Sequence, residues 1–304
     1  MNIGECVVQA EQAFETADLH YGHGTDNARD EAVWLVLNVI GAPLDGSFQH
    51  WQQVVTCEQQ QRICGLVKAR LNSRKPLAYL LSSAWFAGLE FAVNEQVLVP
   101  RSPIAELVQE QFSPWIDAAK INRILDLCTG SGCIAIACAV YLPNVRVDAS
   151  DISPGALELA ATNVVRHVVS DRVRLVQSDL FDALADQVYD LIVTNPPYLA
   201  ENSKRQIPDE YRAEPELGLY SGADGLDLCL HIMLQSPQHL HDGGMLICEV
   251  GESAKRLAAA LPTVPFMWLE FQSGGEGVFL LGREELLQAK GAVAALLEER
   301  ASVG

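Results

Sequence analysis

The sequence predicts neither a signal peptide nor a membrane-spanning segment. Its N-terminus carries no basic region followed by an apolar run, and no apolar stretch is long enough to span a bilayer. Eight cysteines are present, but no two of them form a Cys-x-x-Cys pair. We therefore expect a cytoplasmic protein with free thiols, no membrane partner and no metal site.

Positive charge is also scarce. The 304 residues include 21 Lys and Arg against 39 Asp and Glu, which gives a net charge of -18. An acidic protein repels phosphate backbones, so a basic protein or peptide is a better partner than DNA. The one dense basic cluster consists of Lys68, Arg70, Arg74 and Lys75. We interpret it as cations at a helix C-terminus, with contact to RNA as the alternative.

The length allows a full α/β core and a smaller second domain. Residues 1–85 are predicted to form a helical domain, because segments such as 29–40 place apolar residues at spacings of three and four. Residues 86–102 are predicted to form a β-hairpin linker, with strands at 91–93 and 97–99 around a turn at Asn94 and Glu95. Residues 103–304 would form the main domain.

In this main domain, short apolar runs alternate with helical patterns, which predicts a doubly wound α/β sheet. The last two runs are joined by a linker too short for a helical crossover, so they should pair antiparallel. The expected sheet is mostly parallel with an antiparallel last strand. Its seven predicted strands are residues 124–127, 145–149, 173–177, 191–194, 245–250, 267–271 and 278–281.

A glycine-containing loop follows the first of these strands. It includes Gly130 and Gly132, which would allow the backbone to turn tightly and approach a ligand. The spacing also fits a dinucleotide-binding loop, with Asp151 about 20 residues further on. Cys128 stands before the first glycine, and because cysteine disfavours positive φ we expect an ordinary backbone conformation there.

Carboxylates at successive strand ends move the interpretation away from a dinucleotide. Asp126 ends the first strand, where a carboxylate suits a cationic ligand better than a pyrophosphate. Asp151 follows the second strand and could bind ribose hydroxyls, while Asp179 and Leu180 follow the third and could border an adenine. S-adenosylmethionine has all of these parts. A single carboxylate of this kind usually caps the next helix, but three in succession are not explained by capping alone.

The fourth strand ends in Asn195-Pro196-Pro197-Tyr198. Neither proline can donate a ladder hydrogen bond, so the strand stops and a stiff loop stands at its carboxyl end. The loop offers an amide side chain, carbonyl groups and an aromatic ring, a set suited to holding a planar –NH2 group.

Together these motifs resemble the class I methyltransferases that use S-adenosylmethionine, and more closely the protein-(glutamine-N5) methyltransferases. That family joins a helical N-terminal domain, a β-hairpin linker and a catalytic domain with Asn-Pro-Pro-Tyr, and the resemblance extends over residues 28–285. It implies catalytic roles for Asn195, Pro196 and Tyr198. The residues implied in cofactor binding are Asp126, Cys128, Thr129, Gly130, Ser131, Gly132, Asp151, Asp179, Leu180 and Asn195. Those implied in substrate binding are Asn195, Pro196, Pro197, Tyr198 and Arg101, the last of which could equally form a structural ion pair.

The family has a branch that modifies peptide chain release factors and a branch that modifies the third large-subunit (50S) ribosomal protein, of the uL3 type. Residues 29–34, 74–80, 99–106 and 266–279 resemble the ribosomal branch. The implied partner is then that ribosomal protein, free or in an assembling particle, and the basic cluster could touch ribosomal RNA.

Three alternatives remain beside a release factor as the target. An adenine-N6 methyltransferase also holds an –NH2 group with a similar loop, but it needs a basic nucleic-acid surface that the charge balance disfavours. A dinucleotide-dependent oxidoreductase would bind NAD in place of the methyl donor. A non-catalytic ribosome assembly factor would not need the intact Asn195, Pro196 and Tyr198.

Overall fold

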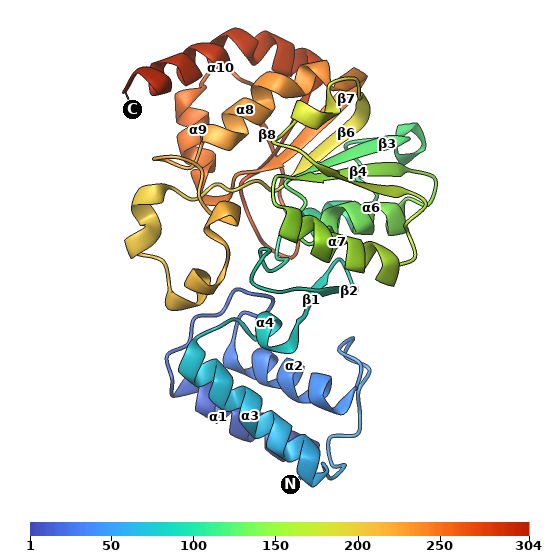
Figure 1. Ribbon diagram of the computed structural model, residues 1–304, viewed down its shortest axis with the longest axis vertical. Coiled ribbons are helices and arrows are strands. Elements are labelled where there is room, and N and C mark those ends of the chain that lie inside the picture. The colour runs from blue at the N-terminus through green and yellow to red at the C-terminus, as the bar shows by residue number, and fades with distance from the viewer. Residues whose placement is uncertain (304) are drawn as a thin grey trace.

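A computed structural model describes residues 1–303 (Figure 1). The N-terminal part is helical, as predicted, and lies on one side of the hairpin, with the large sheet on the other. Each of its three long helices begins at a side-chain cap, formed by Asn2, Asn27 and Thr56. Its helices are α1 (Ile3–Glu15), α2 (Ala28–Ile40), α3 (Cys57–Ser73) and α4 (Leu77–Leu81).

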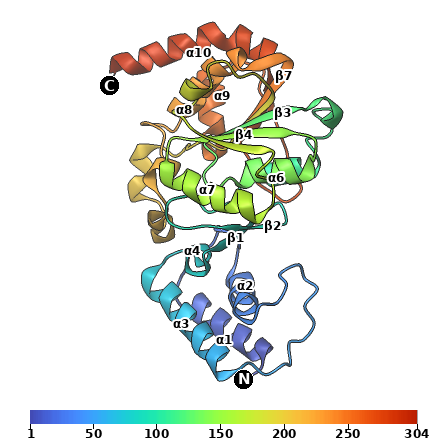
Figure 2. The same ribbon diagram turned by 45° about the vertical axis from the view of Figure 1, so that its right-hand side comes forward.

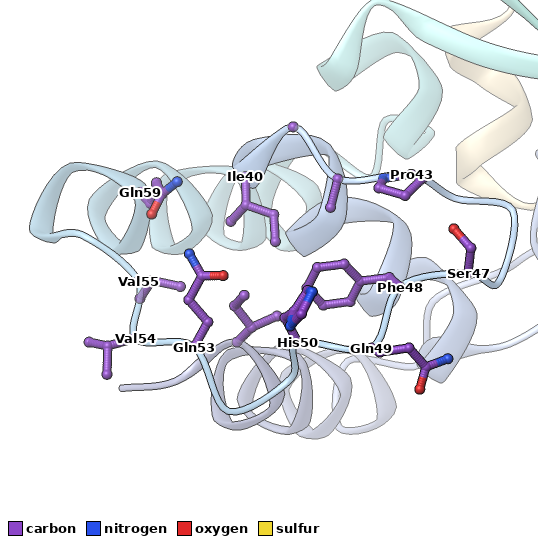
Figure 3. A pocket seen from close by; sticks show the side chains of 13 residues that line it. Ile40, Pro43, Ser47, Phe48, Gln49, His50, Gln53, Val54, Val55 and Gln59 are labelled. Carbon is purple, nitrogen blue, oxygen red and sulfur yellow. The ribbon is translucent and has the colours of Figure 1, made fainter.

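A cavity of about 410 Å³ opens between these helices (Figure 3). It is lined by residues of α1, by the end of α2 and by the loop that leads to α3, with Phe48 and His50 among the side chains. Phe48 also packs edge-on against Trp51, with ring centroids 4.8 Å apart. The cavity belongs to the N-terminal helical part alone.

The hairpin lies earlier in the chain than the sequence predicted. Strand β1 (Ser83–Phe86) pairs antiparallel with β2 (Leu89–Ala92) around Ala87 and Gly88. Both turn residues have positive φ, 50° and 74°, which matches the twist that two-residue hairpin turns require. Sequence reasoning missed the turn because alanine seldom adopts this conformation.

The predicted second hairpin strand at 97–99 is therefore wrong. Val97 and Val99 are buried against the N-terminal helices and lie outside any strand. The Val99 amide donates to the side chain of Glu214, 115 residues away, instead of to a neighbouring strand. The apolar alternation that suggested a strand reflects burial of one side of an irregular segment.

The main domain contains the predicted seven-stranded sheet, in the order β5-β4-β3-β6-β7-β9-β8. All pairings from β5 to β7 are parallel, and the last strand, β9, runs antiparallel to both β7 and β8. The fold prediction is confirmed, although β8 is shorter than expected. The strands are β3 (Arg123–Leu127), β4 (Arg146–Asp151), β5 (Val173–Gln177), β6 (Tyr189–Thr194), β7 (Leu240–Glu249), β8 (Met267–Trp268) and β9 (Val278–Gly282).

Helices cover both faces of this sheet (Figures 1 and 2). One face packs on α5 (Ile104–Gln109), α6 (Cys133–Tyr141) and α7 (Pro154–Arg166). The other packs on α8 (Asp227–Gln235), α9 (Ala254–Ala260) and α10 (Arg283–Val303). The eight cysteines are free thiols, as predicted. Within residues 1–303, no helix combines the length and apolar character needed to cross a membrane.

The segment between β6 and α8 contains no long helix or strand. It holds three short 3-10 helices, at Glu201–Arg205, Asp209–Ala213 and Glu216–Gly218, and lies beside the sheet in Figure 1. The remaining 3-10 turns are Ala118–Lys120, Asp182–Leu184, Ser236–Gln238 and Gly251–Ser253. Loops this long in compact domains commonly serve function, and this one approaches both the candidate site and the N-terminal helices.

Candidate functional site

The four strands whose ends carry the predicted site residues are neighbours in the sheet, in the order β5-β4-β3-β6. Because they run parallel, their carboxyl ends meet at one edge, where open α/β sheets bind ligands. A cavity of about 310 Å³ lies there, which we call the strand-end cavity. Six of the residues predicted to bind the cofactor line it: Cys128, Gly130, Asp151, Asp179, Leu180 and Asn195.

The loop after β3 has an unusual backbone. Cys128, Gly130 and Gly132 all have positive φ, at 58°, 55° and 78°. The expectation of an ordinary conformation at Cys128 is therefore wrong. The loop turns so tightly that it holds even a residue with a Cβ in the left-handed region, at a cost of about 1–2 kcal/mol. A Cβ at Gly132 would lie 3.2 Å from the Ala160 Cβ, so this glycine allows α6 to pack closely on α7.

Asp151 fixes the loop as well as lining the cavity. One carboxylate oxygen accepts a hydrogen bond from the Gly130 amide at 2.9 Å, and the other accepts from the Ser153 amide at 2.9 Å. Burial raises the pKa of this carboxyl, opposed by these backbone bonds. The carboxylate thus lies between the glycine loop and the start of α7, the place predicted for ribose recognition.

Asp126 lies beneath the loop and does not line the cavity. Its Oδ2 accepts from the Thr129 hydroxyl at 2.5 Å and from the Ala135 amide, in the first turn of α6, at 3.0 Å. Oδ1 is buried, and no residue from 1 to 303 donates a hydrogen bond to it. Burial raises the pKa of Asp126 to about 7. Three other predicted residues are likewise part of the loop but do not line the cavity: Thr129, Ser131 and Gly132.

Asn195 stands between the strand-end cavity and a second cavity of about 220 Å³, which we call the Tyr198 cavity. Asn195, Pro196, Tyr198 and Arg101 all line this second cavity, whereas Pro197 lines the first. The Asn195 Oδ1 atom is buried, and no donor in the described part of the chain reaches it. Such an atom is costly to bury unless a ligand satisfies it.

Tyr198 is fixed by residues at the end of β7. Its hydroxyl donates to Glu249 Oε1 at 3.2 Å, and its carbonyl accepts from the Ser253 hydroxyl at 2.7 Å. A Cβ at Gly251, where φ is 44°, would lie 2.5 Å from the Tyr198 ring, so only glycine lets the ring approach this turn. Glu249 also accepts from the Ser102 hydroxyl, and burial raises its pKa. These contacts hold the ring against the wall of the cavity.

Comparisons with known proteins identify the relatives of this chain. Residues 110–210 match the family model described as the methyltransferase small domain. Over 287 residues the chain is 48% identical to the ribosomal protein uL3 glutamine methyltransferase of Xanthomonas campestris, covering 94% of this chain and 93% of that protein. The protein of the same name from Xylella fastidiosa is 47% identical, covering 94% and 92%.

The chain belongs to the ribosomal protein uL3 glutamine methyltransferase family. It is therefore an enzyme that uses a methyl donor of the S-adenosylmethionine type. Among solved structures, a methyltransferase from Pyrococcus furiosus is 17% identical, with a TM-score of 0.46, covering 64% of this chain and 89% of that one.

In this methyltransferase, Arg101 forms the ion pair that the sequence left as an alternative. Its two terminal nitrogens bind the two carboxylate oxygens of Glu214 at 2.6 and 2.8 Å. Burial would raise the pKa of Glu214, but the charge of Arg101 lowers it to about 2. Arg101 still lines the Tyr198 cavity, so the ion pair and a substrate contact are compatible.

The basic cluster of the methyltransferase is mostly occupied within the protein. Arg70 is 1% exposed and binds Glu31 at 2.6 Å, Arg74 caps α3, and Lys75 binds Glu95. The interpretation as cations at a helix C-terminus is confirmed. The alternative of an RNA contact is wrong for Arg70, because its guanidinium does not reach the surface.

Sequence reasoning missed the residues that complete the two cavities. Leu98 lines both of them, Leu217 lines the strand-end cavity, and Tyr211 and Glu252 line the Tyr198 cavity. The available signal was the length of the segment after Tyr198, since long loops in compact domains are usually functional.

Proposed function

We propose that this enzyme transfers a methyl group from S-adenosylmethionine to the side-chain amide nitrogen of a glutamine in ribosomal protein uL3. The observation that carries the proposal is the position of Asn195, which lines both cavities and whose buried amide oxygen accepts no hydrogen bond from residues 1–303. Family membership supplies the class of target, since both relatives are named as uL3 glutamine methyltransferases.

The residues of the strand-end cavity fit S-adenosylmethionine. Asp151 would bind the ribose hydroxyls, Asp179 and Leu180 would border the adenine, and the loop around Gly130 would lie against the amino acid end. Asp126 would act from beneath, by fixing the loop through Thr129 and α6. When bound, this donor supplies a methyl group made electrophilic by the adjacent sulfonium.

The protein's own task is then to position a weak nucleophile. A glutamine amide nitrogen shares its lone pair with the carbonyl, so reaction requires the nitrogen to be held in line with the methyl group. Asn195 Oδ1 can accept one N–H of the substrate, and the Pro196 carbonyl, which accepts no hydrogen bond from residues 1–303, can accept the other. Both bonds strengthen as the nitrogen becomes cationic, so they favour the transition state.

Tyr198 would pack over the amide plane, held there by Glu249 and Ser253. We assign no general base, because a neutral amide is too weakly acidic for any side chain to deprotonate usefully beforehand. As the N–C bond forms, the methyl–sulfur bond would break and leave a neutral thioether. The cationic amide would then be strongly acidic, so it could release its proton to solvent water without a side-chain base. Leu98, which lines both cavities, and Pro197, which lines the strand-end cavity, would add apolar surface around the reacting groups.

We further propose that the helical domain, residues 1–85, docks the target and that the hairpin region joins it to the catalytic domain, residues 103–304. The target is uL3 either free or in an assembling particle, which places the reaction in the cytoplasm. The net charge of -18 suits a basic ribosomal protein.

A methyl-labelling experiment tests this function. Purified enzyme and radioactive S-adenosylmethionine are offered uL3, a 50S assembly intermediate, a release factor and DNA in parallel, and labelled products are mapped by mass spectrometry. We expect label on one glutamine of uL3. Label on release factor or on adenine, with none on uL3, would overturn the proposal.

A further inference from the structure

Tyr211 forms a wall of the Tyr198 cavity, although it lies in the long segment after β6. Its ring is held from two directions. The His23 ring lies 4.6 Å away between centroids, and the Arg101 guanidinium carbon lies 5.2 Å from the Tyr211 centroid. His23 belongs to the loop between α1 and α2, so the N-terminal part contributes directly to the position of this wall.

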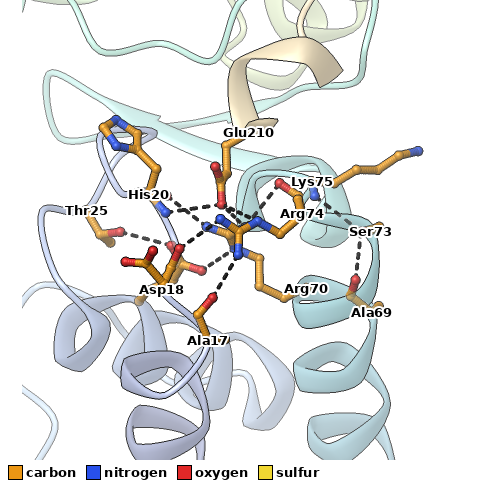
Figure 4. A network of polar contacts seen from close by, with 11 residues as sticks. Ala17, Asp18, His20, Thr25, Ala69, Arg70, Ser73, Arg74, Lys75 and Glu210 are labelled. Atoms are coloured by element: carbon orange, nitrogen blue, oxygen red, sulfur yellow. Dashed lines mark hydrogen bonds and ion pairs between the residues drawn. The ribbon is translucent and has the colours of Figure 1, made fainter. Parts of the chain in front are cut away.

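Glu210, the residue before Tyr211, is fully buried among basic groups of the N-terminal part (Figure 4). Its Oε1 accepts from the His20 amide at 3.1 Å and lies 3.5 Å from Arg70 Nη1 and 3.0 Å from Arg74 Nε. Arg70 is itself held by Glu31. The carboxylate thus fastens the segment to the end of α3 and to the loop between α1 and α2.

Glu214, three residues after Tyr211, is the second buried carboxylate. It binds Arg101 with both oxygens, accepts from the Val99 amide at 2.9 Å, and lies 3.5 Å from His23 Nε2. Its partners come from the chain just after the hairpin and from the N-terminal loop. Tyr211 is therefore flanked on both sides by carboxylates that are bound to groups outside its own segment.

Two buried ion pairs contribute little net stability to a loop. Desolvation offsets most of their attraction, and well-packed apolar groups give similar stability. Charge-assisted hydrogen bonds are directional, so they define the geometry of the groups that they join. Here they fix the stretch from Glu210 to Glu214, which places Tyr211 in the Tyr198 cavity, and Asn195 lines the same cavity.

We propose that Tyr211 determines specificity by packing against the aliphatic stem of the acceptor glutamine, and that Glu210 and Glu214 are the positioning residues that hold it there. This inference rests on the proposed function of the Tyr198 cavity. It gives the N-terminal helices a role in shaping the acceptor site in addition to docking the target.

Substitution of Tyr211 tests the contact. Because the ring would touch the acceptor equally before and during reaction, Tyr211→Ala should raise KM for uL3 roughly 10-fold or more with a small change in kcat. The Kd for S-adenosylmethionine should be unchanged, and Tyr211→Phe should restore most of the lost affinity. Tyr220→Ala is the matched control, since Tyr220 lies in the same segment but packs on Lys204 outside the cavity.

The positioning role is tested with Glu210→Gln, which keeps the shape of the side chain and removes its charge. KM for uL3 should rise, and amide hydrogen exchange across residues 199–224 should accelerate at unchanged cofactor Kd. Glu216→Gln is the control, because Glu216 pairs with Lys204 at the surface. Hydrogen exchange requires no substrate, so it reports on the positioning even if the target is different.

The outcomes separate the two proposals. A wild-type enzyme that methylates uL3, with an unchanged KM in Tyr211→Ala, would overturn the contact. Unchanged exchange in Glu210→Gln would overturn the positioning. A wild-type enzyme with no activity on uL3 would refute the proposed function and with it the Tyr211 contact, whereas the exchange data would still decide whether the carboxylate holds the segment.

Discussion

Replacement of Asn195 by alanine should separate activity from stability in this enzyme. Asn195 lines both cavities, and its buried amide oxygen has no hydrogen-bond donor among residues 1–303. We expect Asn195→Ala to lose turnover, to bind S-adenosylmethionine nearly as well as the wild type, and to fold at least as stably.

The magnitudes follow from what the side chain contacts. Loss of one preorganised hydrogen-bonding group from an active site typically costs about 2.7–4 kcal/mol, or roughly 100- to 1,000-fold in kcat. A buried acceptor without a partner costs about 1–3 kcal/mol, and alanine removes that cost. The truncation enlarges space that already belongs to two cavities, so the usual penalty for a new enclosed void is small.

Three measurements on the wild type and on Asn195→Ala test these expectations. Single-turnover methylation of uL3 gives the rate, calorimetry gives the Kd of the methyl donor, and urea unfolding gives the stability. Near-normal turnover in the variant would refute the role of Asn195 in catalysis. A loss of more than about 2 kcal/mol in the free energy of unfolding would show that the oxygen is satisfied in the free enzyme.

Three other results are expected. Asp151→Ala should weaken donor binding by about 1–3 kcal/mol through loss of a charged hydrogen bond, and an unchanged Kd in calorimetry would argue against its ribose role. Burial lowers the pKa of His23, so the folded state resists its protonation, and stability should fall as pH drops below about 6.5. Urea unfolding from pH 5 to 8 should show a smaller fall in His23→Gln, and identical slopes would contradict this. Gly251→Ala should lower kcat, because a Cβ would displace the Tyr198 ring; full activity in the labelling assay would exclude that contact.

Local patterns were enough to predict the sheet and the strand ends. The apolar runs that became β3, β4, β6 and β7 are mostly buried, as parallel strands in doubly wound folds usually are. The edge strand β5 is partly exposed and runs parallel to its neighbour β4. Because such strands all point the same way, the residues that follow them had to meet at one edge. Asp151, Asp179 and Asn195 therefore lie around one cavity, as their positions in the chain suggested.

Other features depend on contacts that no local pattern contains. Cys128 adopts positive φ because the loop between β3 and α6 leaves it no other conformation, which overrides the preference of its residue type. Ala87 in the hairpin turn likewise adopts a positive φ that its residue type disfavours. The partners of Glu210 and Glu214 lie more than 100 residues earlier in the chain, and carboxylates in a polar segment give no hint that they are buried.

Arg70 pairs with Glu31 and Glu210, and the long sequence separation between these partners has a consequence for biosynthesis. Glu31 precedes Arg70 by 39 residues, whereas Glu210 follows it by 140. At ordinary rates of translation the second carboxylate is made on the order of 10 s after the arginine. Through that interval Glu31 alone can neutralise the guanidinium, so the N-terminal helices can form on the ribosome before the rest of the network has been synthesised. Glu210 then joins a partner that is already in place.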